Sequence, residues 1–283
     1  MNDMSFNATP SAASAADIHA IARDMRRLVV DMAYRTRTAH LGPALGIVEM
    51  LAVLYFRVLE ISPAAANAPQ RDRFILSKGH AAAALYAALA HRGFITRESA
   101  LEQYCVDGGR FHGHPCMHAG PGIEFSTGSL GHGLSVAAGI ALGLRRQGNP
   151  ARVYTLMGDG ECQEGSVWEA AMFAHTHGIS GLTVLVDQNG FQGFGATGEV
   201  HRVDLARLWA ACGWDVQVCD GHDPAALEQA LRAAQATENP SVILAQTVAG
   251  KGIPSLEKTL LSHYAVLDEP GYAEAIRALG YEK

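Results

Sequence analysis

The sequence has no run of basic side chains. Its 283 residues carry 22 Lys and Arg against 28 Asp and Glu, which gives a net charge of −6. Because binding to a nucleic-acid backbone needs clustered Lys and Arg, this distribution argues against a nucleic-acid partner. No apolar stretch approaches the roughly 20 residues that cross a bilayer, so we expect no membrane partner either.

The N-terminal residues lack the apolar segment of a signal peptide. The stretch MNDMSFNATPSAASAAD is polar and small. It predicts a disordered leader over residues 1–16, followed by one domain over residues 17–283. The five cysteines are odd in number and lack the spacing of metal ligands. Unpaired thiols are typical of a reducing compartment, so we expect a cytoplasmic protein.

Helix-like and strand-like segments alternate along the rest of the chain. Apolar residues recur with helical spacing over residues 18–32 and 47–59. Short apolar strands, with helices between them, are expected at 73–77, 153–159, 182–188, 214–220 and 241–247. Such an alternation predicts an α/β fold, in which a parallel sheet has helices on both faces. The Gly-rich passage over residues 108–133 is expected to be a binding loop.

One acidic residue stands between two glycines at the end of an expected strand. Asp159 lies between Gly158 and Gly160, and Asn189 follows the next strand. Ligands of parallel sheets bind beyond the carboxyl ends of the strands. If the two strands are neighbours, both side-chain oxygens converge there, which suits a Mg²⁺ ion that bridges a diphosphate. A lone Gly-Asp-Gly is more often a plain turn, so the spacing to Asn189 carries the metal hypothesis.

Several longer sequence motifs point to one family. GDGECQEGSVWEA, STGSLGHGLSVAAGIALG, FHGHP, SKGHAAAALYAAL and DGHD resemble transketolases, in the order of that family. The spacing from GDG to Asn is similar to the thiamine diphosphate fingerprint. The resemblance covers nearly the whole chain after the leader, whereas a full transketolase is more than twice as long. It therefore implies a thiamine diphosphate-binding fold and the N-terminal, diphosphate-binding subunit of a split transketolase.

The resemblance implies which residues hold the cofactor and its metal. Asp159, Asn189 and the backbone carbonyl of Phe191 match the ligands of Mg²⁺, for which Ca²⁺ or Mn²⁺ are substitutes. The positions that match cofactor contacts are Lys78, His80, Gly128, Leu130, Gly158, Gly160, Glu161, Asn189 and Lys251.

The resemblance also implies catalytic and linking residues. His40, His114 and His263 match histidines that meet substrate hydroxyls and manage protons. Cleavage of a ketose between C2 and C3 needs a base for the C3 hydroxyl, and histidine titrates near neutrality. Glu164 and Glu169 match acids that link paired active sites, with an ordinary exposed helix face as the alternative interpretation.

Parts of the family's site have no match in this sequence. These are the glutamate that protonates the aminopyrimidine, the aromatic wall and the basic residues for sugar phosphates. The resemblance therefore implies a C-terminal partner subunit that carries the pyrimidine half of the site, with sugar phosphates as substrates. Two copies of each chain, in an α2β2 heterotetramer, are the assembly that it implies.

The sequence departs from the family at the expected mouth of the site. Ala249 stands where the family often has Lys, with Lys251 nearby as a substitute, and Pro43 and the Gly193–Gly195 stretch also differ. These departures bear on the donor sugar. Two alternatives stay open. One is the α-chain of a thiamine diphosphate-dependent 2-oxoacid decarboxylase or dehydrogenase, which lacks the TGSLGHG and GHP motifs. The other is an inert scaffold, against which the intact Asp159 counts.

Overall fold

The computed structural model describes residues 15–281. Residues 1–14 of the predicted leader lie outside the described residues, and the first helix, α1 (Ala15–Thr36), includes the last two residues assigned to that leader. No helix of the described residues is long and apolar enough to cross a membrane.

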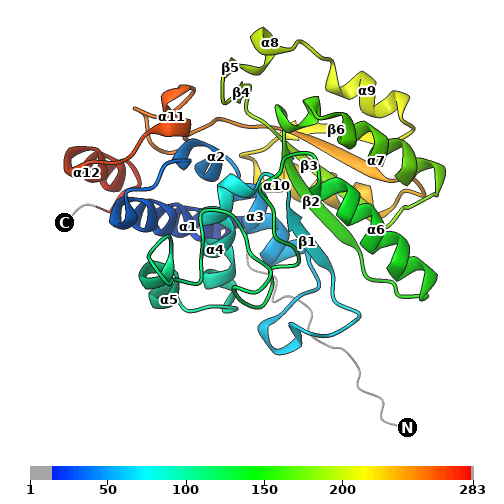
Figure 1. Ribbon diagram of the computed structural model, residues 1–283, viewed down its shortest axis with the longest axis horizontal. Coiled ribbons are helices and arrows are strands. Elements are labelled where there is room, and N and C mark those ends of the chain that lie inside the picture. The colour runs from blue at the N-terminus through cyan, green and yellow to red at the C-terminus, as the bar shows by residue number, and fades with distance from the viewer. Residues whose placement is uncertain (1–14, 282–283) are drawn as a thin grey trace.

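A five-stranded parallel sheet forms the centre of the described chain (Figure 1). Its order is β1-β2-β3-β7-β6. The strands are β1 (Arg73–Leu76), β2 (Val153–Gly158), β3 (Leu182–Gln188), β6 (Asp215–Asp220) and β7 (Ser241–Gln246). β2 and β3 are hydrogen-bonded neighbours, with Gly158 opposite Asp187. The predicted parallel sheet is confirmed, and the adjacency of these strands brings Asp159 and Asn189 to one edge.

Helices cover both faces of the sheet (Figure 1). One face carries α1, α3 (Val48–Val53), α4 (Ala82–Arg92) and α10 (Pro224–Gln235). The other carries α6 (Gly133–Arg146), α7 (Gly165–Thr176) and α9 (Leu205–Ala211). Successive residues of a strand point to opposite faces, so Leu185 of β3 joins the first core and Val184 and Val186 join the second. The continuous apolar strands thus serve two cores.

The local sequence of α10 shows why a helix begins where it does. The Asp223 carboxylate accepts a hydrogen bond from the Ala225 backbone N–H at 2.9 Å, and Pro224 occupies the first turn. An aspartate cap followed by proline is a favoured helix start. Leu227 and Leu231 then fall on one face of the helix and are buried in the core.

Shorter elements complete the described chain. They are α2 (Leu41–Leu45), a π-helical turn (Leu54–Val58), 3-10 turns (Pro63–Ala65, Gly79–Ala81, Glu161–Gln163), α5 (Arg97–Gln103), the antiparallel hairpin β4 (Phe191–Gln192) and β5 (Gly195–Ala196), α8 (Thr197–Val200), α11 (Leu261–Tyr264) and α12 (Glu269–Ala278). Much of the Gly-rich passage over residues 108–133 is loop, and α6 begins at its last residue.

A buried charged group joins α1, α3 and the loop after β6. Glu49 is 5% exposed. Its carboxylate accepts a hydrogen bond from the Arg26 guanidinium and is hydrogen-bonded to the His222 Nδ1 at 3.0 Å. Burial alone would raise the pKa of Glu49, but the hydrogen bond from His222 and the charge of Arg26 lower it to about 2. Ionised Glu49 therefore stabilises the fold.

Replacement of Glu49 with glutamine is expected to lower the free energy of unfolding at pH 7 by about 3 kcal/mol. Because the folded pKa of Glu49 lies below its ordinary value, this stabilisation is present above pH 4.5 and is lost as the pH falls towards 2. Urea unfolding from pH 2 to 8 measures the effect. The control is Glu228→Gln, since the Glu228–Arg232 pair is largely exposed and its loss costs less than about 1 kcal/mol. A Glu49→Gln deficit that does not shrink in acid would contradict the assignment.

Candidate functional site

A cavity of about 450 Å³ lies beyond the carboxyl ends of the sheet strands. Residues that follow β1, β2, β3 and β7 all line it, together with residues of α2, of the Gly-rich passage and of α11. The volume falls in the range of small-molecule sites, and the location is the one that parallel α/β sheets use for ligands.

Most of the residues predicted for the site meet in this cavity. Those that line it are His40, Lys78, His80, His114, Gly128, Leu130, Gly158, Asp159, Gly160, Glu161, Glu164, Asn189, Phe191 and His263. Of the predicted residues, Lys251 and Glu169 are not among those that line it. The Lys251 carbonyl accepts a hydrogen bond from Arg26 at 3.1 Å, and Glu169 is exposed on α7. Ala249 itself lines the cavity, so Lys251 does not replace a lysine there.

Asp159 and Asn189 form an oxygen-rich corner of the cavity. Asp159 is 4% exposed, and its carboxylate accepts hydrogen bonds from the backbone N–H groups of Gly160 at 2.8 Å and Gly190 at 2.9 Å. The Asn189 side-chain oxygen accepts one from the Phe191 N–H at 2.9 Å. Burial, and then the charge of Asp187, raise the pKa of Asp159 to about 6. A nearby cation would favour the ionised form of Asp159.

Few of the oxygens in this corner are charged, which decides the kind of cation it fits. Among the described residues, no group of three His, Cys, Asp or Glu side chains could hold a metal ion. Mg²⁺ is usually held by one or two carboxylates and by phosphate oxygens of the ligand. One carboxylate, one amide oxygen and the nearby Phe191 carbonyl therefore fit Mg²⁺ in combination with a diphosphate.

A buried ion pair between Lys78 and Asp187 lies next to this corner. Lys78 is 1% exposed, and its ammonium donates to the Asp187 carboxylate and to the Pro43 carbonyl at 3.3 Å. Asp187 also accepts from the Thr247 hydroxyl and, at 2.7 Å, from the Asn189 amide nitrogen. The amide of Asn189 is thus held with its nitrogen towards Asp187. Sequence reasoning missed Asp187, although a carboxylate within the apolar strand LTVLVDQ requires a buried partner.

Glu161 joins three loops beneath the cavity. Its buried carboxylate accepts hydrogen bonds from the Ser77 hydroxyl, the Gly131 N–H at 2.9 Å and the Gly158 N–H at 3.2 Å. Burial raises the pKa of Glu161. At Gly131, where φ is 81°, a Cβ atom would lie 2.6 Å from the Glu164 Cβ, so only glycine lets the loop approach this closely. Glu161 therefore fixes the floor of the cavity.

Four histidines from four separate segments gather at the other side of the cavity. The His40 ring lies 5.5 Å from His80, 6.3 Å from His114 and 5.1 Å from His263, centroid to centroid. Burial, followed by the charge of Lys78, lowers the pKa of His80 to about 2. Burial and His40 lower the pKa of His263 to about 4, and burial lowers those of His40 and His114. Around pH 7 these imidazoles are neutral, and each offers one donor and one acceptor nitrogen.

The β4–β5 hairpin forms the rim of the cavity. Gln163 donates to the Gln192 side-chain oxygen at 2.8 Å, and the Tyr264 hydroxyl donates to the Gly193 carbonyl at 2.6 Å. The next residue, Phe194, is 92% exposed. Leu130, which also lines the cavity, is 36% exposed, so apolar side chains face the solvent around its opening.

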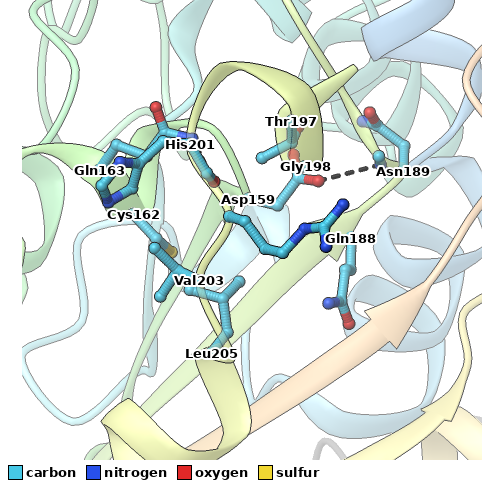
Figure 2. Close-up of a pocket in the computed structure, with 12 residues that line it drawn as sticks. Asp159, Cys162, Gln163, Gln188, Asn189, Thr197, Gly198, His201, Val203 and Leu205 are labelled. Atoms are coloured by element: carbon cyan, nitrogen blue, oxygen red, sulfur yellow. Dashed lines mark hydrogen bonds between the residues drawn. The ribbon is translucent and has the colours of Figure 1, made fainter.

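A second cavity of about 280 Å³ adjoins the first (Figure 2). Figure 2 shows Asp159, Thr197 and Asn189 among the residues around it. Asp159 and Asn189 line both cavities, so the oxygen-rich corner separates them. The Thr197 hydroxyl is buried there and has no hydrogen-bond partner among the described residues.

Comparison with known proteins gives the class of domain. Residues 18–283 match the family described as transketolase, thiamine diphosphate binding domain. A 6-deoxy-6-sulfo-D-fructose transketolase subunit from Clostridium sp. (strain MSTE9) is 40% identical over 271 residues, which are 94% of this chain and 97% of that protein. One subunit of an apulose-4-phosphate transketolase from Phocaeicola vulgatus is 36% identical over 256 residues, covering 89% of this chain and 90% of that one.

The solved structures agree with this class. Transketolase from Campylobacter jejuni superimposes with a TM-score of 0.88 at 29% sequence identity, and the match covers 94% of this chain but 43% of that one. The chain belongs to the transketolase family. The predicted α/β fold, the family and the assignment to one subunit of a transferase are confirmed.

Proposed function

We propose that this chain is the N-terminal subunit of a thiamine diphosphate-dependent transketolase, which moves a two-carbon ketol unit from a ketose to an aldose. The observation that carries the proposal is the meeting of Asp159, Asn189 and four neutral histidines in one cavity at the strand ends. The two relatives named as transketolase subunits, each matched over nine tenths of its length, support it.

The oxygen-rich corner would hold the metal and the diphosphate. Asp159, Asn189 and the Phe191 carbonyl would bind Mg²⁺, and Gly158, where a Cβ would meet no atom within 4 Å, leaves room for phosphate oxygens beside it. When bound, thiamine diphosphate supplies the nucleophilic carbon and the electron sink for cleavage of a carbon–carbon bond. The protein's task is to orient the cofactor and to control protons around the sugar.

The histidine cluster would control those protons. Because His40, His80 and His263 are neutral, a ring nitrogen could accept the proton of the donor's C3 hydroxyl as the C2–C3 bond breaks, and could return it to the oxygen of the acceptor aldehyde as the new bond forms. A cationic imidazole offers no acceptor nitrogen. Burial of the cluster lowers each pKa and therefore keeps the imidazoles in their unprotonated form.

The relatives bear on the sugar. Their names specify a sulfonated and a phosphorylated sugar, which supports a substrate with an anionic end, such as a ketose phosphate. The test is a screen of ketose phosphates and sulfonates with the chain, its partner subunit, thiamine diphosphate and Mg²⁺. Transfer of two carbons is the expected result, and no transfer from any ketose would contradict the proposal.

The assembly and the compartment complete the proposal. A C-terminal subunit would cover the rim around Phe194 and supply the pyrimidine half of the site, in an α2β2 assembly. The cysteines, all of them free, are compatible with a reducing cytoplasm.

Replacement of His114 with alanine is expected to lower kcat about 10- to 100-fold and to change the cofactor Kd less than about threefold. His114 lines the cavity, and its Cδ2 lies 3.4 Å from where a Cβ on Gly128 would stand. A residue that meets the sugar contributes mainly as the transition state forms. Steady-state kinetics and calorimetry measure the two quantities. The matched control is His112→Ala, two residues away, exposed and not among the cavity-lining residues. Equal kcat values for both variants would reject the role.

A further inference from the structure

One wall of the cavity is a chain segment with little regular structure. Residues 247–263, here called the wall segment, follow β7 and contain the start of α11. Ala249, Ser262 and His263 are among its residues that line the cavity. Because few backbone hydrogen bonds of a helix or sheet hold this segment, its contacts with the rest of the protein determine its path.

Several hydrogen bonds join the beginning of the wall segment to the rest of the protein. The Thr247 hydroxyl donates to Asp187, and the Gly250 N–H donates to the Gly42 carbonyl at 3.1 Å. The Val248 N–H donates to the His222 Nε2 at 2.8 Å, and the Lys251 carbonyl accepts from the Arg26 Nε at 3.1 Å. Ala249 lies between Val248 and Lys251 and is 4% exposed. The His222 and Arg26 side chains both contact the Glu49 carboxylate. Two of the contacts that flank Ala249 therefore come from α1 and the loop after β6, through side chains that Glu49 of α3 holds.

The hydrogen-bond partners of His222 indicate its tautomer. Its Nε2 accepts from the Val248 N–H, so that nitrogen carries no proton, and its Nδ1 carries one that it donates to Glu49. Charged groups from three elements lie around the His222 ring. Glu49 of α3 is paired with Arg26 of α1. Asp220, two residues before His222, accepts a hydrogen bond from the His222 backbone N–H at 2.8 Å. Addition of a proton at Nε2 would place two donors against each other and release Val248.

We propose that His222 is a positioning residue for the reaction, which fixes the wall segment through Val248. His222 is not among the residues that line the cavity, so it acts through the segment. The far end of the segment touches the histidine cluster, because the His263 carbonyl accepts from the His40 N–H at 3.0 Å. Displacement at Val248 therefore acts directly on its neighbour Ala249, which lines the cavity. The effect on turnover rests on the proposed function, whereas the contact with Val248 does not.

Two substitutions separate the two hydrogen bonds of His222. Glutamine reaches the position of Nε2, so His222→Gln can still accept from Val248 but loses the bond to Glu49. Asparagine reaches only the position of Nδ1, so His222→Asn can still donate to Glu49 but loses the bond to Val248. In the complex with the partner subunit, we expect turnover to fall about 10- to 100-fold in His222→Asn and less than about threefold in His222→Gln. A loss of stability alone would not lower the turnover of His222→Asn more than that of His222→Gln.

Amide exchange and nitrogen NMR test the contact without any activity. In the chain alone, the Val248 amide is expected to keep its protection in His222→Gln and to lose it in His222→Asn. The ¹⁵N spectrum of the wild-type chain at pH 7 is expected to show His222 protonated at Nδ1 and bare at Nε2, assigned by its absence in His222→Gln. A proton on Nε2, or equal Val248 protection in both variants, would overturn the proposal. If one variant fails to fold, the wild-type spectrum still decides the question. A wild-type complex that transfers no ketol unit would refute the proposed function, and the exchange result would still decide the role of His222.

Discussion

Asp159→Ala is expected to lower the affinity for thiamine diphosphate in the presence of Mg²⁺ at least about 100-fold. The substitution removes the charged oxygen donor at the corner where the diphosphate would bind, and Asn189 and the Phe191 carbonyl alone would leave Mg²⁺ with neutral protein ligands. The backbone N–H groups of Gly160 and Gly190 lose their acceptor. Each unpaired N–H costs about 1–3 kcal/mol of stability. Removal of a carboxylate whose pKa is raised by burial offsets part of this cost, so the domain should still fold. Calorimetric titration of the complex with the partner subunit measures the affinity.

Two further variants make this experiment specific. Asp159→Asn keeps the shape of the side chain and removes the charge, so it should show a similar loss of affinity. Asp107→Ala removes a charge from an exposed position in the loop after α5 and should bind the cofactor as the wild type does. Undiminished affinity of Asp159→Ala, in a variant with a wild-type circular dichroism spectrum, would refute the metal assignment.

The chain alone is expected to show at least about 100-fold less two-carbon transfer than its complex with the C-terminal subunit. Among the acids that line the cavity, Asp159 and Glu161 are committed to backbone N–H groups, and Glu164 is exposed. None of these is placed to serve as the acid for the aminopyrimidine. The rim is also open, since Leu130 and Phe194 are exposed, and an open cavity does not exclude water from the reaction.

The rim offers a variant that tests the assembly directly. Phe194→Ser is expected to weaken association with the partner about tenfold or more, because a buried aromatic anchor commonly contributes 1–3 kcal/mol or more to an interface. Val218→Ser, on the exposed side of β6 and outside the cavity lining, is the control. Titration by analytical ultracentrifugation measures both. Full activity of the purified chain without a second polypeptide would contradict the split-enzyme account.

The site could be predicted where chemistry and topology act together. The Gly-Asp-Gly turn ends one strand and Asn189 follows the next, so a parallel sheet brings them together whatever the loops do. The histidines His40 and His263 lie far apart in sequence, and only the resemblance predicted that they meet. Their separation of 5.1 Å depends on the wall segment, whose path no local pattern encodes.

Other features of the site depend on loop turns and buried pairs that the sequence pattern does not show. Lys251 follows Gly250, where φ is 77° and a Cβ would lie 2.5 Å from the Leu256 carbonyl oxygen. This turn exposes Ala249, not Lys251, to the cavity. Lys78 lines the cavity but is paired with Asp187, because a buried ammonium requires an acid within reach. The β4–β5 hairpin was not predicted, since two-residue strands next to glycines carry no periodicity.

Product analysis tests the central claim most directly. The purified chain and its partner subunit would be incubated with thiamine diphosphate, Mg²⁺, a ¹³C-labelled ketose phosphate and an aldose acceptor, and followed by ¹³C NMR. We expect C1 and C2 of the ketose to appear together in a product two carbons longer than the acceptor, with no labelled carbon dioxide and no transfer when Mg²⁺ is chelated. Release of carbon dioxide from a 2-oxoacid, or no transfer from any ketose tested, would contradict the account.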